Sequence, residues 1–153
     1  MVTVRPLREE EAGPLAGGLA ALPLMVRYRR EAGRIEADLQ AARSRGEGLL
    51  VAEERGRLCG LAWFLRAGTL GMGGYLRLLA VLGEAQRSGV GARLLAAWEA
   101  EAARESRHAF LLVSDFNEGA QRFYERHGYA RCGALPGLVL PDVVELVYWK
   151  RLR

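Results

Sequence analysis

The sequence contains a single lysine, Lys150, so arginine carries nearly all of the positive charge of its 22 basic residues. A Walker-type phosphate loop requires a lysine after its last glycine, followed by a hydroxyl residue that binds Mg²⁺. Lys150 lies between a tryptophan and an arginine and cannot serve such a loop. The scarcity of lysine therefore excludes this class of nucleotide-binding protein.

Cysteine and histidine are also scarce, with two residues of each. Cys59 and Cys132 are far apart and form no C-x-x-C pair, which indicates two reduced cysteines rather than a redox or metal motif. A cysteine nucleophile needs a neighbouring base, and nothing in the sequence places His108 or His127 beside either cysteine. We therefore expect no metal ion and no acyl-cysteine chemistry.

Long hydrophobic runs are missing as well. No segment has the roughly 18 consecutive apolar residues that span a bilayer, and Met1 to Arg8 lack the apolar centre of a signal peptide. These absences predict a cytoplasmic protein without a membrane partner. Apolar residues make up 50% of the chain and charged residues 26%, which is typical of one globular domain, here expected over residues 1–153.

The formal net charge of +4 is modest, and basic and acidic residues are interspersed along the chain. Nucleic-acid binding is typical of basic stripes with interleaved aromatic residues. Only Arg27-Tyr28-Arg29-Arg30 and Arg43-Ser44-Arg45 approach such a stripe, so we expect no nucleic-acid partner. The mild positive excess equally suits an anionic small ligand.

The most informative segment present is the polar, glycine-containing stretch from Gln86 to Leu95. A largely apolar run from Leu76 to Leu82, interrupted only by Arg77, precedes it, and an amphipathic helix is predicted over Gly89–Arg104. A strand, a short turn with glycines and a helix form a site for anions, because the free N–H groups and the dipole of the first helical turn favour negative charge. The segment therefore predicts a phosphate-binding turn.

The spacing of the glycines separates two kinds of phosphate site. A dinucleotide-binding turn follows G-x-G-x-x-G, but Leu94 occupies the place of the third glycine. The alternative pattern, Q/R-x-x-G-x-G/A, is satisfied by Gln86, Gly89 and Gly91. A second motif follows a predicted strand, His108–Ser114, with the frame N-x-x-A-x-x-F-Y-x-x-x-G-Y beginning at Asn117.

These two motifs, in this order and on strand–helix elements, resemble the coenzyme A-binding motifs of the GNAT acetyltransferase superfamily. The resemblance covers Gly73 to about Ala130 well and the first 70 residues only in outline. It implies an α/β (α+β) fold with a mixed central sheet of about six to seven strands and helices on both faces.

The elements expected along the chain agree with that fold. Helices are expected from Glu9, from Leu24 to Arg45, over Gly89–Arg104 and over Glu118–His127, with Ala134 to Pro141 as a loop near the end. Strands are expected at Val2–Leu7, Gly48–Glu54, Leu58–Leu65, Gly73–Leu82, His108–Ser114, Tyr129–Gly133 and Val143–Arg153.

The resemblance implies acetyl-CoA as co-substrate. The residues expected to hold its pyrophosphate are Gln86, Arg87, Ser88, Gly89, Val90, Gly91 and Ala92. The pantetheine arm is expected along the backbone of Leu79, Ala80 and Val81, although an ordinary central strand would give the same apolar pattern. The second motif adds Asn117, Ala120, Phe123 and Tyr124. Arg87 or Arg93 could reach the ribose phosphate or face solvent.

Tyr124 is the expected acid catalyst. A tyrosine phenol, with a pKa near 10, could protonate a departing thiolate, whose pKa is about 8.5 by comparison with cysteine. Its spacing with Ala120, Phe123 and His127 also allows it to be a packing residue. Asn117 has a second expected role, the cap of the helix that follows.

The general base is left open by the sequence. Relatives with a glutamate on the strand before the loop carry it at the position of Tyr75, so this chain departs from that pattern. Glu84 is expected to face solvent. Glu53, Glu54 and Asp115 are the other candidate carboxylates, and a water chain is an alternative to all of them.

The predicted activity is N-acetylation of a primary amine by direct transfer in a ternary complex, with a backbone N–H near Val81 stabilising the oxyanion. The acceptor, a small molecule or a peptide, is expected between the first two helices and the Ala134–Pro141 loop. An inward-facing Arg27, Arg29 or Arg30 would favour an acceptor with a carboxylate or phosphate. The alternative function is a non-catalytic acyl-CoA sensor, and a homodimer is left open.

Overall fold

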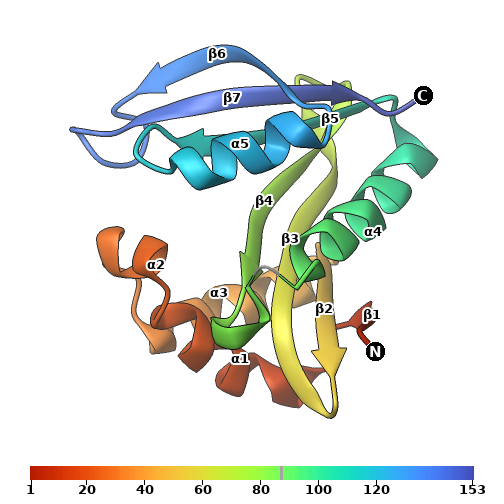
Figure 1. The fold of residues 1–153 in the computed structure, drawn as a ribbon, viewed down its shortest axis with the longest axis vertical. Helices are drawn as coiled ribbons and strands as arrows, with labels where there is room; N and C mark the ends of the chain where they lie inside the picture. Colours follow the sequence, from red (N-terminus) through yellow and green to blue (C-terminus); the bar gives the residue numbers. More distant parts are fainter. Residues whose placement is uncertain (87) are drawn as a thin grey trace. The chain divides into compact units, whose positions relative to one another are not determined.

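The computed structural model describes residues 1–86 and 88–153. Figure 1 shows its elements. The strands are β1 Thr3–Pro6, β2 Gly48–Glu54, β3 Arg57–Thr69, β4 Gly73–Val81, β5 His108–Ser114, β6 Ala130–Pro136 and β7 Val144–Arg151. The helices are α1 Ala12–Ala20, α2 Pro23–Arg27, α3 Ala32–Ser44, α4 Val90–Glu105 and α5 Glu118–Arg126, with short 3₁₀ turns η1 Glu9–Glu11 and η2 Gly83–Ala85.

The seven strands form one sheet in the order β1-β2-β3-β4-β5-β7-β6. The β4–β5 pair is parallel, whereas the β1–β2, β2–β3, β5–β7 and β6–β7 pairs are antiparallel. The predicted mixed sheet of an α/β fold is thereby confirmed. None of the helices in residues 1–86 and 88–153 is long and apolar enough to cross a membrane.

The chain divides into two compact units, each built from two segments. The first unit contains Met1–Phe64 and Leu78–Trp98, and the second contains Leu65–Arg77 and Glu99–Arg153. Strands β3 and β4 and helix α4 contribute residues to both units. Each unit is described separately below.

The core of the first unit lies between its strands and helices α1 to α3. Alternate residues of β2 and β3 point to this side, namely Leu49, Val51, Leu61 and Trp63. The helices contribute Ala12, Leu15, Ala16, Leu19, Met25, Ile35, Leu39 and Ala42. Because successive strand residues face opposite sides, this alternation assigns one face of the unit to the three helices.

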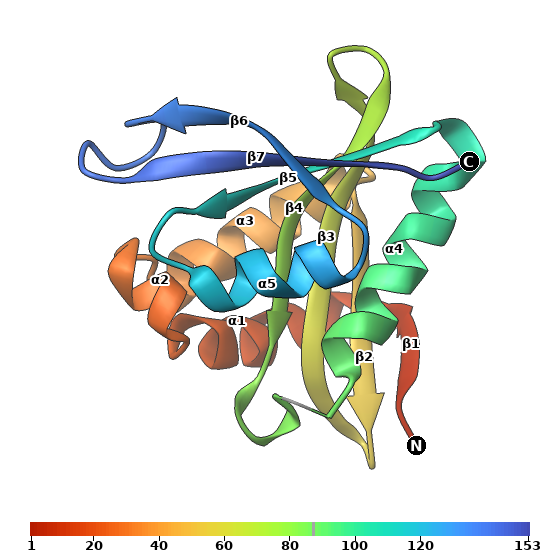
Figure 2. The same cartoon turned by 45° about the horizontal axis from the view of Figure 1, so that its top comes forward.

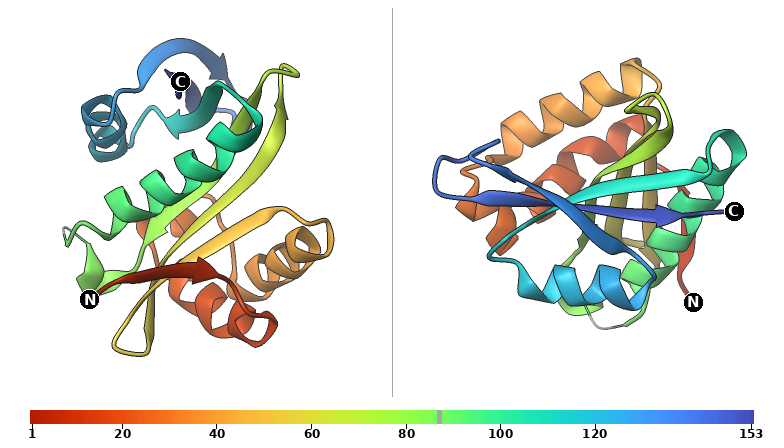
Figure 3. Two further views of the ribbon diagram at one scale, coloured as in Figure 1. Left: turned by 90° about the vertical axis from the view of Figure 1, so that its right-hand side faces the viewer. Right: turned by 90° about the horizontal axis from the view of Figure 1, so that it is seen from above.

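The opposite face of the same strands receives the start of α4 (Figure 3, left). A Cβ at Gly60 would lie only 2.7 Å from the Leu94 side chain, so the glycine on β3 lets α4 approach closely. Phe64 packs on Trp98 with ring centroids 6.3 Å apart. Helices therefore cover both faces of the strands in this unit, as predicted.

The single helix predicted from Leu24 to Arg45 is wrong. The chain forms two helices, α2 and α3, separated by a turn in which Arg29 has a φ of +54°. The backbone N–H of Arg30 donates to the carbonyl of Met25 at 2.9 Å, which closes α2. The Arg30 side chain then binds Asp38 on α3, so an ion pair fixes the turn that periodicity alone could not reveal.

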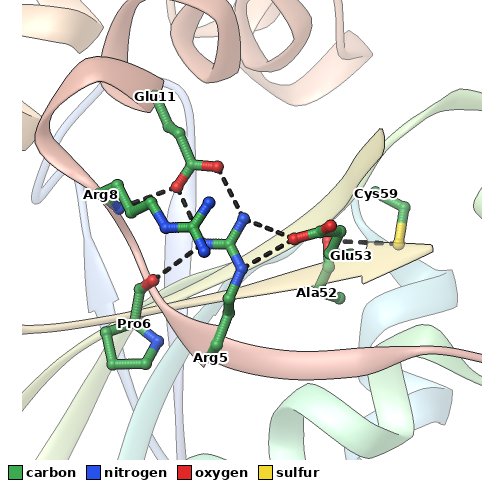
Figure 4. A network of polar contacts seen from close by, with 7 residues as sticks. All are labelled: Arg5, Pro6, Arg8, Glu11, Ala52, Glu53 and Cys59. Atoms are coloured by element: carbon green, nitrogen blue, oxygen red, sulfur yellow. Dashed lines mark hydrogen bonds and ion pairs between the residues drawn. The ribbon is translucent and has the colours of Figure 1, made fainter. Parts of the chain in front are cut away.

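A charged network ties β1 to η1 and β2 (Figure 4). Arg5 donates to both carboxylate oxygens of Glu11, at 2.9 and 2.7 Å, and to Glu53 at 2.8 Å. The Arg5 guanidinium, together with the Arg8 backbone N–H, lowers the pKa of Glu11 to about 2 despite its partial burial. Nearby, the Cys59 thiol donates to the Ala52 carbonyl at 3.3 Å. The network is therefore a structural anchor for the N-terminal strand.

In the second unit, α5 runs alongside β5 and β7 (Figure 2). The Tyr148 hydroxyl of β7 donates to Glu125 of α5 at 2.8 Å, and Lys150 donates to Glu99 of α4 at 3.1 Å. Even-numbered residues of β7 therefore face these helices. Odd-numbered residues, such as Glu145, face the opposite side of the sheet because side chains alternate along a strand.

The predicted loop from Ala134 to Pro141 is partly wrong, because β6 continues through Pro136. Pro136 pairs with Val144 in the β6–β7 ladder. The hairpin closes at Gly137, whose φ is +69° and whose N–H donates to the Val143 carbonyl at 3.0 Å. Antiparallel pairing with β7 thus extends β6 to Pro136, although proline is rare inside strands.

Candidate active site

The segment between β4 and α4 is a tight turn held by its own backbone. The N–H of Ala85 donates to the Leu82 carbonyl at 3.0 Å, and the N–H of Gln86 donates to the Gly83 carbonyl at 3.2 Å. Gly83 and Gly89 have φ values of +44° and +84°. These left-handed conformations favour glycine, so the shape of the turn requires Gly89 of the motif and also Gly83, which precedes the motif.

The side chains of the turn bind back to its own backbone. Gln86 Nε2 donates to the carbonyl of Val81, the last residue of β4, at 3.2 Å. The exposed Ser88 donates its hydroxyl hydrogen to the Ala85 carbonyl. Both predicted ligands therefore shape the turn. Arg87 and the side chain of Glu84 lie outside the described residues.

The start of α4 has backbone N–H groups that precede the first hydrogen bond of the helix. The first helical hydrogen bond of α4 runs from the N–H of Arg93 to the carbonyl of Gly89, at 3.2 Å. The N–H groups of Val90, Gly91 and Ala92 precede it and have no acceptor within the helix. An ideal Cβ on Gly89 would meet no atom within 4 Å, so the backbone is open to a ligand there. The arrangement fits a phosphate or pyrophosphate group.

The β4–β5 ladder ends early. Its last pair is Leu76 with Leu111, although β4 continues to Val81 and β5 continues to Ser114. In the first unit, the Leu82 N–H bonds the Cys59 carbonyl on β3 at 2.9 Å, so the end of β4 is held from its β3 side. The segment Leu79–Val81 therefore differs from a strand paired along both edges.

The second motif lies in the second unit and begins with a helix cap. Asn117 Oδ1 accepts a hydrogen bond from the Ala120 N–H at 3.2 Å. The structure therefore confirms the capping role of Asn117. Gln121 reinforces the junction, since its side-chain amide donates to the carbonyls of Ser114 and Asp115 at 3.3 and 3.1 Å. These bonds fix the start of α5 on the end of β5.

Tyr124 is buried, with 8% of its surface exposed. Its ring meets those of Phe123 and Tyr129 edge to face, with centroids 5.2 and 5.6 Å apart. Tyr129 is held in turn by a hydrogen bond to Glu99 at 2.8 Å. Within the described part of the chain, no hydrogen bond engages the Tyr124 hydroxyl. Burial raises the pKa of Tyr124 above its usual value near 10, so the phenol is neutral near pH 7 and available as a donor.

The carboxylates that the sequence leaves open as bases are engaged elsewhere. Glu53 pairs with Arg5 at 2.6 Å. Glu54 lies 3.7 Å from the terminal amino group of Met1. Asp115 accepts a hydrogen bond from the Val144 N–H at 3.3 Å. Each of these carboxylates has a structural partner.

Glu145 on β7 is a buried residue that was not predicted from the sequence. Its carboxylate is buried, with 6% of the residue exposed, and lies 3.3 and 3.4 Å from the hydroxyl oxygen of Ser114. The sequence feature that could have identified Glu145 is a charged residue at a buried position of the strand Val144–Arg151, in which apolar and polar residues alternate. From the strand's own sequence, such a charged residue is predicted to face solvent. Its burial can be predicted only when the neighbouring strand is known.

A hollow of about 520 Å³ lies in the first unit where α1, α2 and α3 meet. Its lining combines apolar side chains such as Met25 and Val26 with Arg29, Arg30 and Glu31. Arg30 is occupied by Asp38, and Arg29 is exposed in its left-handed turn. Of the arginines predicted near an acceptor, the structure therefore brings two to this hollow.

Comparison with known proteins accounts for this arrangement. The family model described as acetyltransferase (GNAT) domain matches residues 45–131. No match exists among proteins with curated descriptions.

Three solved structures illustrate the similarity in fold. A GNAT-family protein from Desulfovibrio desulfuricans has a TM-score of 0.83 at 20% identity, covering 100% of both chains. An aminoglycoside 6'-N-acetyltransferase complexed with coenzyme A has a TM-score of 0.79 at 18% identity, covering 99% of this chain and 97% of that one. The yncA protein of Salmonella typhimurium, solved with its cofactor acetyl-CoA, has a TM-score of 0.77 at 18% identity, covering 99% and 94%. The family match spans more than half of the chain and includes the turn before α4, so this protein belongs to the GNAT family of acetyltransferases.

Proposed function

We propose that this acetyltransferase binds acetyl-CoA at the turn between β4 and α4 and transfers the acetyl group to a primary amine. The observation that carries the proposal is the start of α4, where the N–H groups of Val90, Gly91 and Ala92 have no acceptor within the helix and directly follow the left-handed Gly89. A diphosphate matches this arrangement because each of its oxygens can accept backbone hydrogen bonds at the positive end of a helix dipole. Coenzyme A carries such a diphosphate between its nucleotide and its thiol arm.

The side chains of the turn support the diphosphate site indirectly. Gln86 and Ser88 hold the turn in shape through their bonds to Val81 and Ala85. Arg87, from its place in the motif, is proposed to add a positive charge. Arg93 is exposed on the first turn of α4 and is a second candidate for the ribose phosphate.

The backbone of Leu79, Ala80 and Val81 is proposed to pair with the pantetheine arm. The β4–β5 ladder stops at Leu76, and an extended ligand with amide groups can add to such an edge as a peptide strand does. The N–H of Val81 is then proposed to stabilise the negative charge that develops on the acetyl oxygen. The residues of the second motif proposed to contact the same arm are Asn117, Ala120 and Phe123.

Tyr124 is proposed to donate a hydrogen bond and finally a proton to the departing sulfur. A phenol with a raised pKa is a weaker acid than free tyrosine, but it stays protonated across the physiological range. Its function is therefore to offer a fixed O–H as thiolate character develops, and Phe123 and Tyr129 fix its ring. Acetyl-CoA itself supplies the activated thioester.

Transfer is proposed to be direct, from thioester to amine in a ternary complex. Cys59 is buried, its thiol donates to the Ala52 carbonyl, and burial raises its pKa, which all disfavour a thiolate nucleophile. Cys132 is exposed on β6. The acceptor is proposed to enter near the hollow beside α2, where the exposed Arg29 would favour an amine that also carries an anionic group.

The experiment is a screen of primary amines with acetyl-CoA held constant, in which a chromogenic reagent detects the free thiol of coenzyme A. The panel contains amino acids, polyamines, aminoglycosides and short peptides with free N-termini. Thiol release that depends on an amine supports the proposal. Binding of coenzyme A without thiol release for any amine would instead support an acyl-CoA sensor.

A further inference from the structure

Among the residues that the structure describes, Glu145 is the one charged residue that is buried. It stands directly opposite Ser114 in the β5–β7 ladder, and Ser114 is also only 6% exposed. Both oxygens of the carboxylate lie 3.3 to 3.4 Å from the one Ser114 hydroxyl. Carboxylates are rarely buried in protein interiors, so the place of Glu145 in the sheet is informative.

Glu145 lies on the side of the sheet that α5 does not cover. On β7, Tyr148 bonds to α5, and Glu145, three positions away, points to the opposite side. On β5, Phe110 and Ser114 share this opposite side because they are four residues apart, and Phe110 pairs with Tyr75 of β4. Paired residues share a face, so the Tyr75 phenol and the Glu145 carboxylate belong to one face of three adjacent strands.

The pKa values agree with this placement. Burial is the main cause that raises the pKa of Tyr75, and the negative charge of Glu145 raises it further while Arg77 lowers it. Glu145 therefore acts on the phenol electrostatically.

Glu145 also lies at the relevant end of the sheet. Ser114 is the last residue of β5 and lies three residues beyond Leu111, where the parallel β4–β5 ladder stops. In open sheets, ligands bind at the carboxyl ends of parallel strands. Glu145 of the antiparallel neighbour β7 therefore lies beside the carboxyl end of β5.

We propose that Glu145 is the base that accepts a proton from the acceptor ammonium, with Ser114 and Tyr75 as positioning residues. This inference rests on the proposed acetyl transfer. An N–H bond of the ammonium breaks and its proton passes to Glu145, so the nitrogen lone pair is free to form the C–N bond as the C–S bond breaks. The sulfur takes the proton of Tyr124, and the second proton lost from the nitrogen returns to Tyr124 through solvent. Glu145 then releases its proton, so each turnover yields one proton.

The test compares the wild-type protein with Glu145→Gln, which keeps the shape of the side chain and removes its basicity. We expect kcat at pH 7 to fall by about 100-fold or more, with the Kd for coenzyme A unchanged within about twofold. The deficit should shrink with a weakly basic amine such as trifluoroethylamine, because that amine is already neutral. The matched control is Glu125→Gln, which alters a hydrogen-bonded carboxylate on the covered side and should keep wild-type kcat.

The outcomes separate two failures. If wild type turns over and Glu145→Gln does so within about threefold at every pH with both amines, Glu145 is not the base, and the acetyltransferase proposal stands. If wild type releases no thiol with any amine, the proposed function fails and this inference falls with it. Should Glu145→Gln fail to fold, Glu145→Asp must show a kcat deficit that depends on amine basicity, and a deficit independent of basicity would overturn the proposal.

Discussion

Gln86 donates a hydrogen bond from its side-chain amide to the backbone carbonyl of Val81, at 3.2 Å. This bond ties the turn that is proposed to bind the diphosphate to the end of the strand that is proposed to hold the thioester. The conformation of the turn and the position of the Val81 backbone are therefore coupled through one side chain.

Replacing Gln86 with alanine should weaken coenzyme A binding. The loss of one neutral hydrogen bond is worth about 1 kcal/mol, or roughly fivefold in Kd, and isothermal titration calorimetry measures it. Gln40→Ala is the control, because the Gln40 amide also donates to a backbone carbonyl, that of Glu9, at 3.3 Å. Equal Kd values for the two variants would contradict the role of Gln86.

Gly89→Ala should weaken coenzyme A binding about tenfold. A Cβ at φ +84° strains the backbone by about 1 to 2 kcal/mol even where space is free, so the turn relaxes and its N–H groups turn away from the ligand. Gly46→Ala is the matched control, since Gly46 has a φ of +74°, equally open space and no part in the site. Both variants should lose similar stability in thermal unfolding, but only Gly89→Ala should lose affinity.

Tyr124→Phe should lower kcat by about 10- to 100-fold and leave the KM for acetyl-CoA nearly unchanged. The reason is that the hydroxyl is proposed to act only on the departing sulfur. Tyr129→Phe, the control, removes a hydrogen bond to Glu99 and should lower the melting temperature with kcat kept within about threefold. A Tyr124→Phe variant with wild-type kcat would assign Tyr124 a packing role alone.

The Glu11 carboxylate should make stability depend on acidity. Its pKa is lowered from 4.5 to about 2 by Arg5, so its contribution is complete above about pH 4.5 and is lost as the pH falls toward 2. Glu11→Gln should lower the free energy of unfolding by about 2 kcal/mol at pH 7. In urea titrations across this range, the difference from wild type should vanish near pH 2. The exposed Glu10→Gln is the control, and a pH-independent difference for Glu11→Gln would refute the assignment.

The parts of the fold with local signals were predictable from the sequence. The strand Gly48–Glu54 and the strand His108–Ser114 have the predicted bounds, because turn residues and charges flank short apolar runs. The turn before α4 was predictable because glycine spacing and helix periodicity coincide there. Asn117 was predictable as a helix cap because capping is also local: its side chain accepts a hydrogen bond from the N–H three residues later.

The parts that depend on distant partners were not predictable. The break between α2 and α3 depends on the ion pair of Arg30 with Asp38, and the length of β6 depends on its pairing with β7. The burial of Glu145 could not be predicted because it depends on the position of Glu145 opposite Ser114. These two residues are 31 positions apart in the sequence. Strand pairing decides which face a residue occupies, and the alternation within one strand does not contain that information.

The most direct test of the account is a calorimetric titration of the purified protein with coenzyme A and, separately, with pantetheine, which lacks the diphosphate and the nucleotide. The account predicts one molecule of coenzyme A bound per chain and binding of pantetheine at least about tenfold weaker, because the N–H groups after Gly89 engage the diphosphate. Equal affinity for the two compounds, or no heat of binding with coenzyme A, would contradict it.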